Sequence, residues 1–229
     1  MKSAMPYHGL RNTETRVICR KVFADYEFDP RAGKRWRDDV LAIWRGAERR
    51  EERYAAIELA QHREARPLHT LEALPMFEEM IVTGAWWDYV DTIASHDLGL
   101  VLRQEPKPMR RAMLAWSKCD DMWKRRSSIL CQLHYKAETD LELLYACIEP
   151  SLASKEFFLR KAIGWALRQY AWTDPLEVQS FVRANEHRLS GLSVREALKN
   201  VVGASAKPST AASSAVTSSR APGAKRRSA

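Results

Sequence analysis

The sequence has few of the signals that accompany β-structure. It contains only nine glycines in 229 residues, and no stretch alternates Val, Ile or Thr with polar residues between turn pairs, as a strand would. These absences argue against a sandwich or a barrel. Hydrophobic residues make up 45% of the chain, which is enough for one sizeable core. We therefore expect a single helical domain.

The chain also lacks the segments that direct a protein into or across a membrane. No apolar run reaches the length of about 18 residues that a transmembrane helix requires. The first residues, MKSAMPYHGL, contain no apolar stretch of the kind found in secretory signals. We therefore expect a cytoplasmic protein with no membrane partner.

Cysteine is scarce, and the spacing of the cysteines matches no metal-binding motif. The four cysteines are Cys19, Cys119, Cys131 and Cys147, and they include no CxxC pair. At least two of them lie inside apolar helical patterns, where a thiol behaves as a small hydrophobic side chain, so we expect neither a disulfide framework nor a zinc site. The sequence also has no His/Cys cluster, no glycine-rich phosphate loop and no GxSxG motif. We expect no metal and no cofactor.

The positive charge of the chain is concentrated at its end. The formal charge is +8, and residues 204–229 carry five basic residues and no acid, which leaves about +3 on residues 1–203. The end segment is rich in Ser, Ala, Thr and Pro and has little to bury, so we expect a disordered basic tail after a folded domain of residues 1–203. Such a tail either adds affinity for a polyanion or serves only solubility.

Helix signals occupy the rest of the sequence. In DPLE, Asp174 is suited to cap a helix, Pro175 to its first position and Glu177 to a capping box. The run SVRE repeats this pattern with Ser193 and Glu196. Further helices are predicted at 35–46, 48–63, 75–82, 84–95, 108–117, 120–135, 140–150 and 154–171.

A period of 39 residues relates three of these helices. Trp87, Arg126 and Trp165 are evenly spaced, close to the unit of about 40–47 residues in HEAT and armadillo repeats. Residues at one phase of such a unit face the same side of the stack, usually the concave binding side. We therefore predict an all-α fold, a HEAT-like helical-repeat solenoid or α-α superhelix, with a concave face for a partner.

Each of the repeated positions also has a purely structural interpretation. Trp87 and Trp165 suit the packing of one repeat against the next. Arg126 falls within or at the edge of an apolar stripe, where an unpaired charge is costly, so it needs a carboxylate or a phosphate. Asp91 lies one turn after Trp87 and is a candidate for an internal salt bridge with Arg126. We expect Asp88 to lie at the rim in solvent.

Three motifs in this order carry a family resemblance. The runs WWDYVD, MWKRRSSILCQL and FFLRKAIGWALRQYA resemble the DNA alkylation repair enzymes of the AlkD type, which are HEAT-like-repeat DNA glycosylases. The resemblance covers roughly residues 1–200. One departure lies at the start, where MKSAMPYHGL resembles a stretch that follows an extra N-terminal helix in the family. We expect this member to lack that helix, or its start to lie further upstream.

The resemblance implies a function and roles for particular residues. It makes Asp91 the catalytic carboxylate, Trp87 and Trp165 an aromatic pair beside the deoxyribose of the lesion, and Arg126 a cation near the DNA phosphates. The implied reaction is removal of cationic N3- and N7-alkylated purines from double-stranded DNA. The sequence has no lysine clearly placed as a Schiff-base nucleophile, so we expect an enzyme that cleaves no strand. We also expect a nucleoid-associated monomer. Among the other basic residues, Arg125 and Lys161 are candidates for contact with the DNA backbone.

Two other functions fit the same fold. A non-catalytic relative would bind damaged or branched DNA without releasing a base. A helical-repeat scaffold would bind proteins, and its affinity for DNA would not fall steeply with salt.

Overall fold

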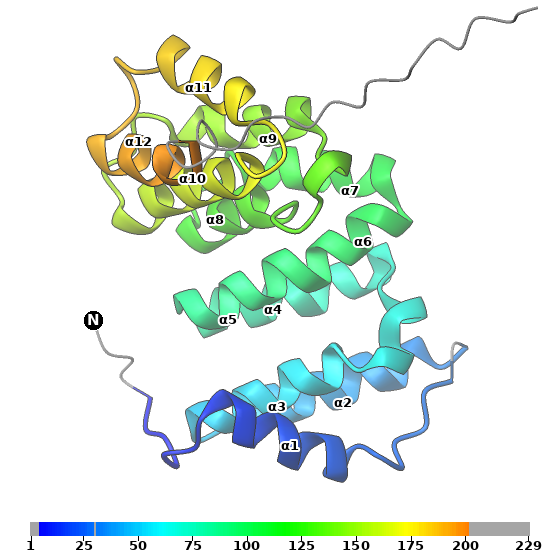
Figure 1. Cartoon of the computed structure of the whole chain (residues 1–229). Coiled ribbons are helices and arrows are strands. Elements are labelled where there is room, and N and C mark those ends of the chain that lie inside the picture. Colours follow the sequence, from blue (N-terminus) through cyan, green and yellow to red (C-terminus); the bar gives the residue numbers. More distant parts are fainter. Residues whose placement is uncertain (1–4, 30, 202–229) are drawn as a thin grey trace, which may run out of the picture.

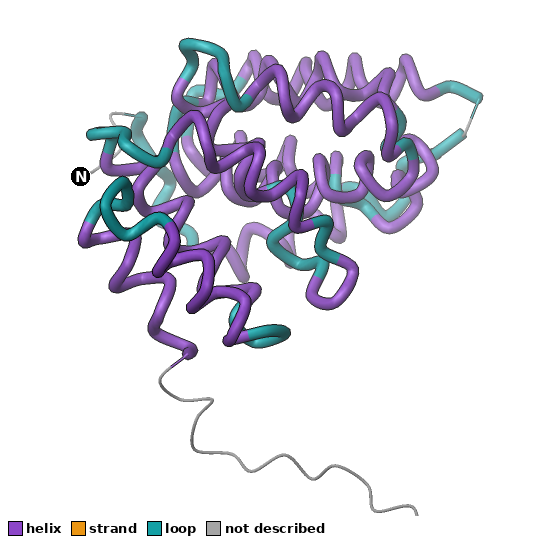
Figure 2. The backbone as a smooth tube through the Cα atoms, turned by 90° about the horizontal axis from the view of Figure 1, so that it is seen from above, coloured by secondary structure: helices purple, strands orange, loops and turns teal. Residues whose placement is uncertain are grey.

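The computed structural model describes residues 5–29 and 31–201 of the chain. Within these residues the regular secondary structure is all helical and there is no strand (Figure 2), which confirms the predicted all-α class. The predicted tail, 204–229, lies outside the described residues. Within the described part, each helix is too short or too polar to cross a membrane. The helices are α1 (Asn12–Val22), α2 (Gly33–Gly46), α3 (Arg50–Ala60), α4 (Leu74–Gly84), α5 (Trp87–Thr92), α6 (Gly99–Gln104), α7 (Pro106–Trp116), α8 (Met122–Leu130), α9 (Leu141–Ile148), α10 (Phe157–Tyr170), α11 (Pro175–Ala184) and α12 (Gly191–Ala197).

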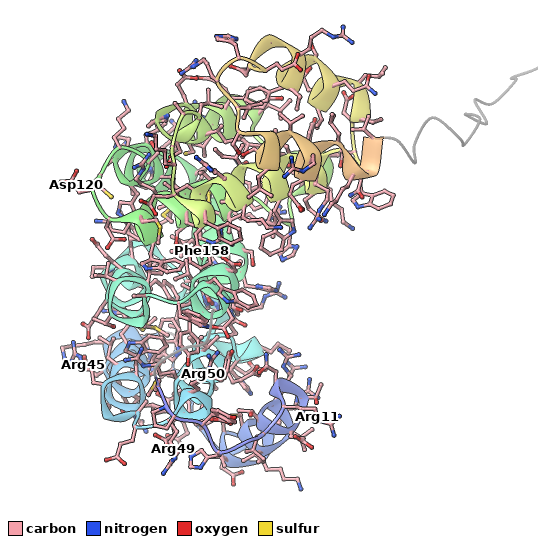
Figure 3. All side chains as sticks on the ribbon, turned by 90° about the vertical axis from the view of Figure 1, so that its left-hand side faces the viewer. Arg11, Arg45, Arg49, Arg50, Asp120 and Phe158 are labelled. Carbon is pink, nitrogen blue, oxygen red and sulfur yellow. The ribbon has the colours of Figure 1, made fainter. Side chains whose placement is uncertain are left out.

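The helices stack in layers along one direction, as a helical-repeat solenoid does (Figure 1). One row contains α5, α8, α10 and α12, each packed on the next, and α4, α7 and α11 pack against members of this row. A continuous cluster of buried side chains runs from α2 to the end of α12. Seen edge-on, the stack has a curved outline, and its first and last helices reach towards the same side (Figure 3).

The helix that carries WWDYVD differs from its predicted bounds of 84–95. Ala85 has a left-handed backbone with φ of 41°, which ends α4, and α5 begins only at Trp87. Its far end continues through a π-helical turn, Ile93–Leu98, directly into α6. A π turn changes the direction in which successive side chains point. The helix therefore presents Asp91 and Asp97 to different neighbours.

The two predicted capping boxes have different outcomes. Asp174 caps α11 as predicted, accepting hydrogen bonds from the backbone of Leu176 and Glu177. The Glu177 carboxylate does not complete the box, because it accepts a hydrogen bond from the Tyr145 hydroxyl. The SVRE prediction is wrong, since α12 begins earlier and Ser190 is its cap. Glu196 is thereby free for a different role.

The sequence interpretation missed α1. Its apolar residues do not mark the buried face, because Val17, Ile18 and Val22 are all exposed. The buried positions are Thr15 and Cys19. In such a helix the apolar stripe does not coincide with the face that packs on the core.

Candidate functional site

Four helices of one row line an open cavity of about 440 Å³. This volume lies in the range of small-ligand sites. The cavity is lined by Trp87 and Asp91 from α5, Arg126 from α8, Phe157, Phe158, Lys161, Trp165 and Arg168 from α10, and Glu196 from α12. The three residues related by the 39-residue period thus meet at one place, together with the aspartate one turn beyond the first of them.

Asp91 and Arg126 form a two-pronged ion pair at the wall of the cavity. The Nε atom of Arg126 donates to Oδ1 of Asp91 at 2.6 Å, and Nη2 donates to Oδ2 at 2.8 Å. This parallel geometry fixes the plane of the carboxylate. Asp91 is 7% exposed. Burial raises the pKa of Asp91 above its usual 3.8, and the charge of Arg126 only partly offsets this effect.

The remaining contacts of Arg126 explain why a buried guanidinium is tolerated. Its Nη1 atom donates to the main-chain carbonyl of Phe158, and the ring of Phe158 lies 5.8 Å from the guanidinium carbon. Arg126 is only 4% exposed. Of its two candidate partners, the carboxylate is therefore the one in contact. A direct bond from Arg126 to a DNA phosphate is not favoured by this arrangement.

The two tryptophans of the cavity differ from the tryptophans of the core. Trp87 is the first residue of α5 and is 45% exposed, whereas Trp36 and Trp44 are almost completely buried. Trp165 is partly buried and packs against the core while it lines the cavity. Packing in the core thus explains part of the position of Trp165, but it explains little of the position of Trp87.

Asp88, three residues before Asp91, has a separate set of partners. Its carboxylate accepts hydrogen bonds from Arg50 and from the Tyr54 hydroxyl, and its side chain is only 17% exposed. The expectation that Asp88 lies in solvent is therefore wrong. The neighbouring Trp86 ring lies 5.8 Å from the guanidinium carbon of Arg50. Asp88 and Trp86 join α5 to α3 through Arg50, which Figure 3 labels, and Trp87 and Asp91 line the cavity.

The predicted basic residues have different locations. Lys161 lines the cavity, and its Nζ atom lies 3.0 Å from Oε1 of Glu196. Arg125 is not among the lining residues. Its Nη2 atom donates to the carbonyl of Pro150 at 2.9 Å and to Oγ of Ser151 at 2.8 Å. The structure thus brings Lys161 to the site and joins Arg125 to the 3-10 turn Glu149–Ser151 that follows α9.

Sequence reasoning missed Glu196 as a member of the site. The SVRE pattern suggested a helix cap, but the Glu196 carboxylate faces three cations instead. A sequence signal does exist: Gly164, next to Trp165, is a glycine inside a helix. A Cβ at Gly164 would lie 2.5 Å from the Cβ of Glu196. Such a close approach of two helices predicts a neighbour at that point but does not identify it.

Comparison with known proteins places this geometry in a family. Among the described residues, no group of three or more His, Cys, Asp or Glu side chains is arranged to hold a metal ion. No curated protein matches the chain. A solved structure, a predicted DNA alkylation repair enzyme from Enterococcus faecalis, is similar with a TM-score of 0.74 and 27% identity over 84% of this chain and 87% of its own. The family model of the DNA alkylation repair enzymes matches residues 1–201. The chain belongs to the DNA alkylation repair enzyme family.

Proposed function

We propose that the chain is a monofunctional DNA glycosylase that hydrolyses the N-glycosidic bond of cationic N3- or N7-alkylated purines in duplex DNA. Substrates of this class include 7-methylguanine and 3-methyladenine. The observation that carries the proposal is the Asp91 carboxylate, held by Arg126 at the wall of a cavity that Trp87 and Trp165 also line. Membership of a DNA alkylation repair family supports the choice of substrate.

The chemistry of a cationic purine suits a site whose central group is a carboxylate. When the bond between C1′ and the ring nitrogen breaks, its electron pair leaves with the base, which becomes neutral. Positive charge then develops on the sugar, and an anion nearby stabilises it, as in glycoside hydrolysis. Water adds its oxygen to C1′ and releases one proton to solvent. Asp91 supplies the negative charge and accepts a hydrogen bond from that water.

Arg126 acts in this proposal through Asp91. The two N–H donors of Arg126 occupy one lone pair on each carboxylate oxygen, and the other lone pairs remain for water and for the sugar. The pair fixes the plane of the carboxylate before the substrate arrives, which removes a reorganisation cost from the reaction. Arg126 is thus a positioning residue.

Trp87 and Trp165 bind the damaged nucleotide. An indole face attracts a cation by about 0.5–2 kcal/mol and packs on a sugar ring. The exposure of Trp87 leaves its ring available to a partner. The aromatic lining thus favours a lesion that carries charge over a neutral lesion such as 8-oxoguanine.

The arrangement of Lys161 favours hydrolysis without strand cleavage. A bifunctional glycosylase attacks C1′ with an uncharged amine. Lys161 is the lysine that lines this cavity, and its ammonium group donates to Glu196. We therefore assign Lys161 to the DNA backbone, and water to the attack on C1′. In this proposal the protein acts as a monomer in the cytoplasm, at the nucleoid, on double-stranded DNA.

A base-release assay tests the proposal. The wild-type protein is incubated with a duplex that contains one 7-methylguanine, and free base is measured by chromatography. We expect release of the base, and strand breaks only after alkali. A matched duplex with 8-oxoguanine should release nothing. A protein that binds DNA but liberates no base is a non-catalytic relative, and one whose binding does not weaken steeply with salt is a scaffold.

A further inference from the structure

Three basic side chains converge on one carboxylate beside the proposed catalytic residue. The Nζ atoms of Lys161 and Lys199 lie 3.0 Å and 2.7 Å from Oε1 of Glu196. The Nη1 atom of Arg168 lies 2.8 Å from Oε2. Glu196, Lys161 and Arg168 also line the cavity that contains Asp91. We call Glu196, Lys161, Arg168 and Lys199 the Glu196 cluster.

The carboxylate at the centre of this cluster is rigidly placed. Glu196 is 7% exposed, and its Cβ packs against the backbone of α10 at Gly164, where any other residue would collide with it. Two hydrogen bonds fix the same helix contact, from Ser193 Oγ to the carbonyl of Arg160 at 3.0 Å and from Asn200 Nδ2 to the carbonyl of Arg168 at 2.9 Å. The Glu196 carboxylate is thus held in place by the fold, and the longer basic side chains form ion pairs with it.

The charge of the cluster does not cancel. Three cations and one carboxylate leave a formal charge of +2. The hydrogen bond from Lys199 is the largest of several effects that lower the pKa of Glu196 to about 2, so the carboxylate is ionised at neutral pH. The side chains of Lys161, Arg168 and Lys199 are 38%, 29% and 52% exposed. Each cation retains N–H donors beyond the one that Glu196 accepts.

We propose that the Glu196 cluster binds one backbone phosphate of the DNA strand beside the lesion, and that Glu196 is the positioning residue that gathers the three cations. This inference rests on the proposed glycosylase function. A phosphodiester carries one negative charge and two free oxygens, so the positive cluster attracts it and the spare N–H donors of the cluster can bond to its oxygens. Because α10 also carries Trp165, a phosphate held here fixes the nucleotide against the indole.

A carboxylate in a DNA-binding surface has two opposing effects. It lowers the general attraction for DNA, because it cancels one positive charge. It also removes rotamer freedom from two lysines and an arginine, each of which would lose about 0.5–1.5 kcal/mol on immobilisation by DNA alone. Replacing Glu196 with Gln therefore separates the two effects. Binding to undamaged DNA should strengthen, and correct placement of the damaged nucleotide should weaken.

The experiment compares Glu196→Gln with the charge-matched control Glu79→Gln. Glu79 on α4 is paired with Arg45 on α2, and Glu79 is not among the residues that line the cavity. We expect Glu196→Gln to bind an undamaged duplex at least as tightly as wild type and to release 7-methylguanine about tenfold more slowly in single turnover, a change of about 1.4 kcal/mol in activation free energy. Glu79→Gln should release base at the wild-type rate. A folded Glu196→Gln protein with an undiminished rate overturns the inference.

A second variant keeps the test independent of folding and of activity. Lys199→Gln alters an exposed side chain and should reduce the slope of log affinity against log salt by about 0.9, as loss of one phosphate contact does. The probe is an undamaged duplex, so this result is obtained even if wild type releases no base and the proposed function fails. An unchanged slope in Lys199→Gln shows that no phosphate binds at the cluster.

Discussion

Asp91 and Asp97 lie six residues apart on one continuous helical segment, and both are buried carboxylates paired with a base. Asp91 bonds to Arg126. Asp97 lies 2.9 Å from Nε2 of His69 and accepts a hydrogen bond from Gln61 at 2.8 Å. Each of the two carboxylates lines a cavity of about 440 Å³. Burial, pairing and cavity size therefore do not distinguish them.

The surroundings of the two carboxylates do distinguish them. Asp91 lines a cavity with two indole rings and two phenyl rings. The cavity at Asp97 is lined by arginine and histidine side chains, with Tyr135 the only phenol or indole ring in its lining. Asp97 is 1% exposed, whereas Asp91 is 7% exposed. We infer that Asp97 holds the π turn in place and that Asp91 meets the substrate.

The largest expected effect is the contrast between Asp91→Asn and Asp97→Asn. Asp91→Asn removes the charge that stabilises the sugar, so the single-turnover rate of 7-methylguanine release should fall by about 10²–10³-fold, with DNA binding retained. Asp97→Asn should leave the rate within about threefold, or less than about 1 kcal/mol.

Asp97→Asn should lower the stability of the protein, although it has little effect on the rate. The Asp97→Asn variant weakens a buried hydrogen-bond network, so its free energy of unfolding in urea should fall by about 1–3 kcal/mol. A rate loss of equal size in the two variants would show that the comparison of their surroundings has no functional meaning.

The next effect separates the tryptophans of the cavity from those of the core. Trp87→Ala should lower the single-turnover rate by about tenfold, since a cation–indole contact contributes about 0.5–2 kcal/mol. Its unfolding free energy should change little, because the ring is 45% exposed. Trp36→Ala, in the core, should cost about 3–5 kcal/mol of stability. Urea unfolding and base release, measured on both variants, check the contrast; a large stability loss in Trp87→Ala contradicts it.

A smaller effect distinguishes Lys161 from Arg125. Lys161 lines the cavity, so Lys161→Gln should weaken binding to any duplex and reduce the salt slope by about 0.9. Arg125 is bonded to Pro150 and Ser151, so Arg125→Gln should leave the salt slope unchanged. Fluorescence anisotropy at several salt concentrations measures both. If the salt slope fell equally in the two variants, Arg125 would also contact the DNA backbone.

The smallest effect is a difference in pH dependence between the two carboxylates of the site. The pKa of Glu196 is lowered from 4.5 to about 2, so its contribution to stability is present above pH 4.5 and is lost as the pH falls towards 2. The pKa of Asp91 is raised from 3.8, so its contribution is present below pH 3.8 and is lost as the pH rises through the raised value.

Urea midpoints across this pH range test both signs. The stability of wild type should converge on that of Glu196→Gln as the pH falls. Relative to Asp91→Asn, wild type should gain stability over the same range. If the stability difference between wild type and variant changed in the same direction with pH for both carboxylates, the environments assigned to Asp91 and Glu196 would be wrong.

The sequence predicted more of the fold than of the site. The spacing of Trp87, Arg126 and Trp165 predicted that these residues face one side of a solenoid, and they do line one cavity. The sequence did not predict α1, whose aliphatic side chains are exposed. It also assigned Glu196 to a helix cap, because a Ser-x-x-Glu pattern looks the same whether the glutamate faces its own helix or a neighbouring one.

The sequence by itself determined the all-helical class, the repeat and the residues that the repeat aligns, because these depend on periodicities along the chain. The tertiary structure alone decided which partner each charged side chain has. Arg126 had two possible partners in the sequence, and Asp88 was expected to have none. Packing of α5 against α8 paired Arg126 with Asp91, and packing of α5 against α3 gave Asp88 its partners. The energy of a buried charge depends on neighbours that the local sequence does not contain.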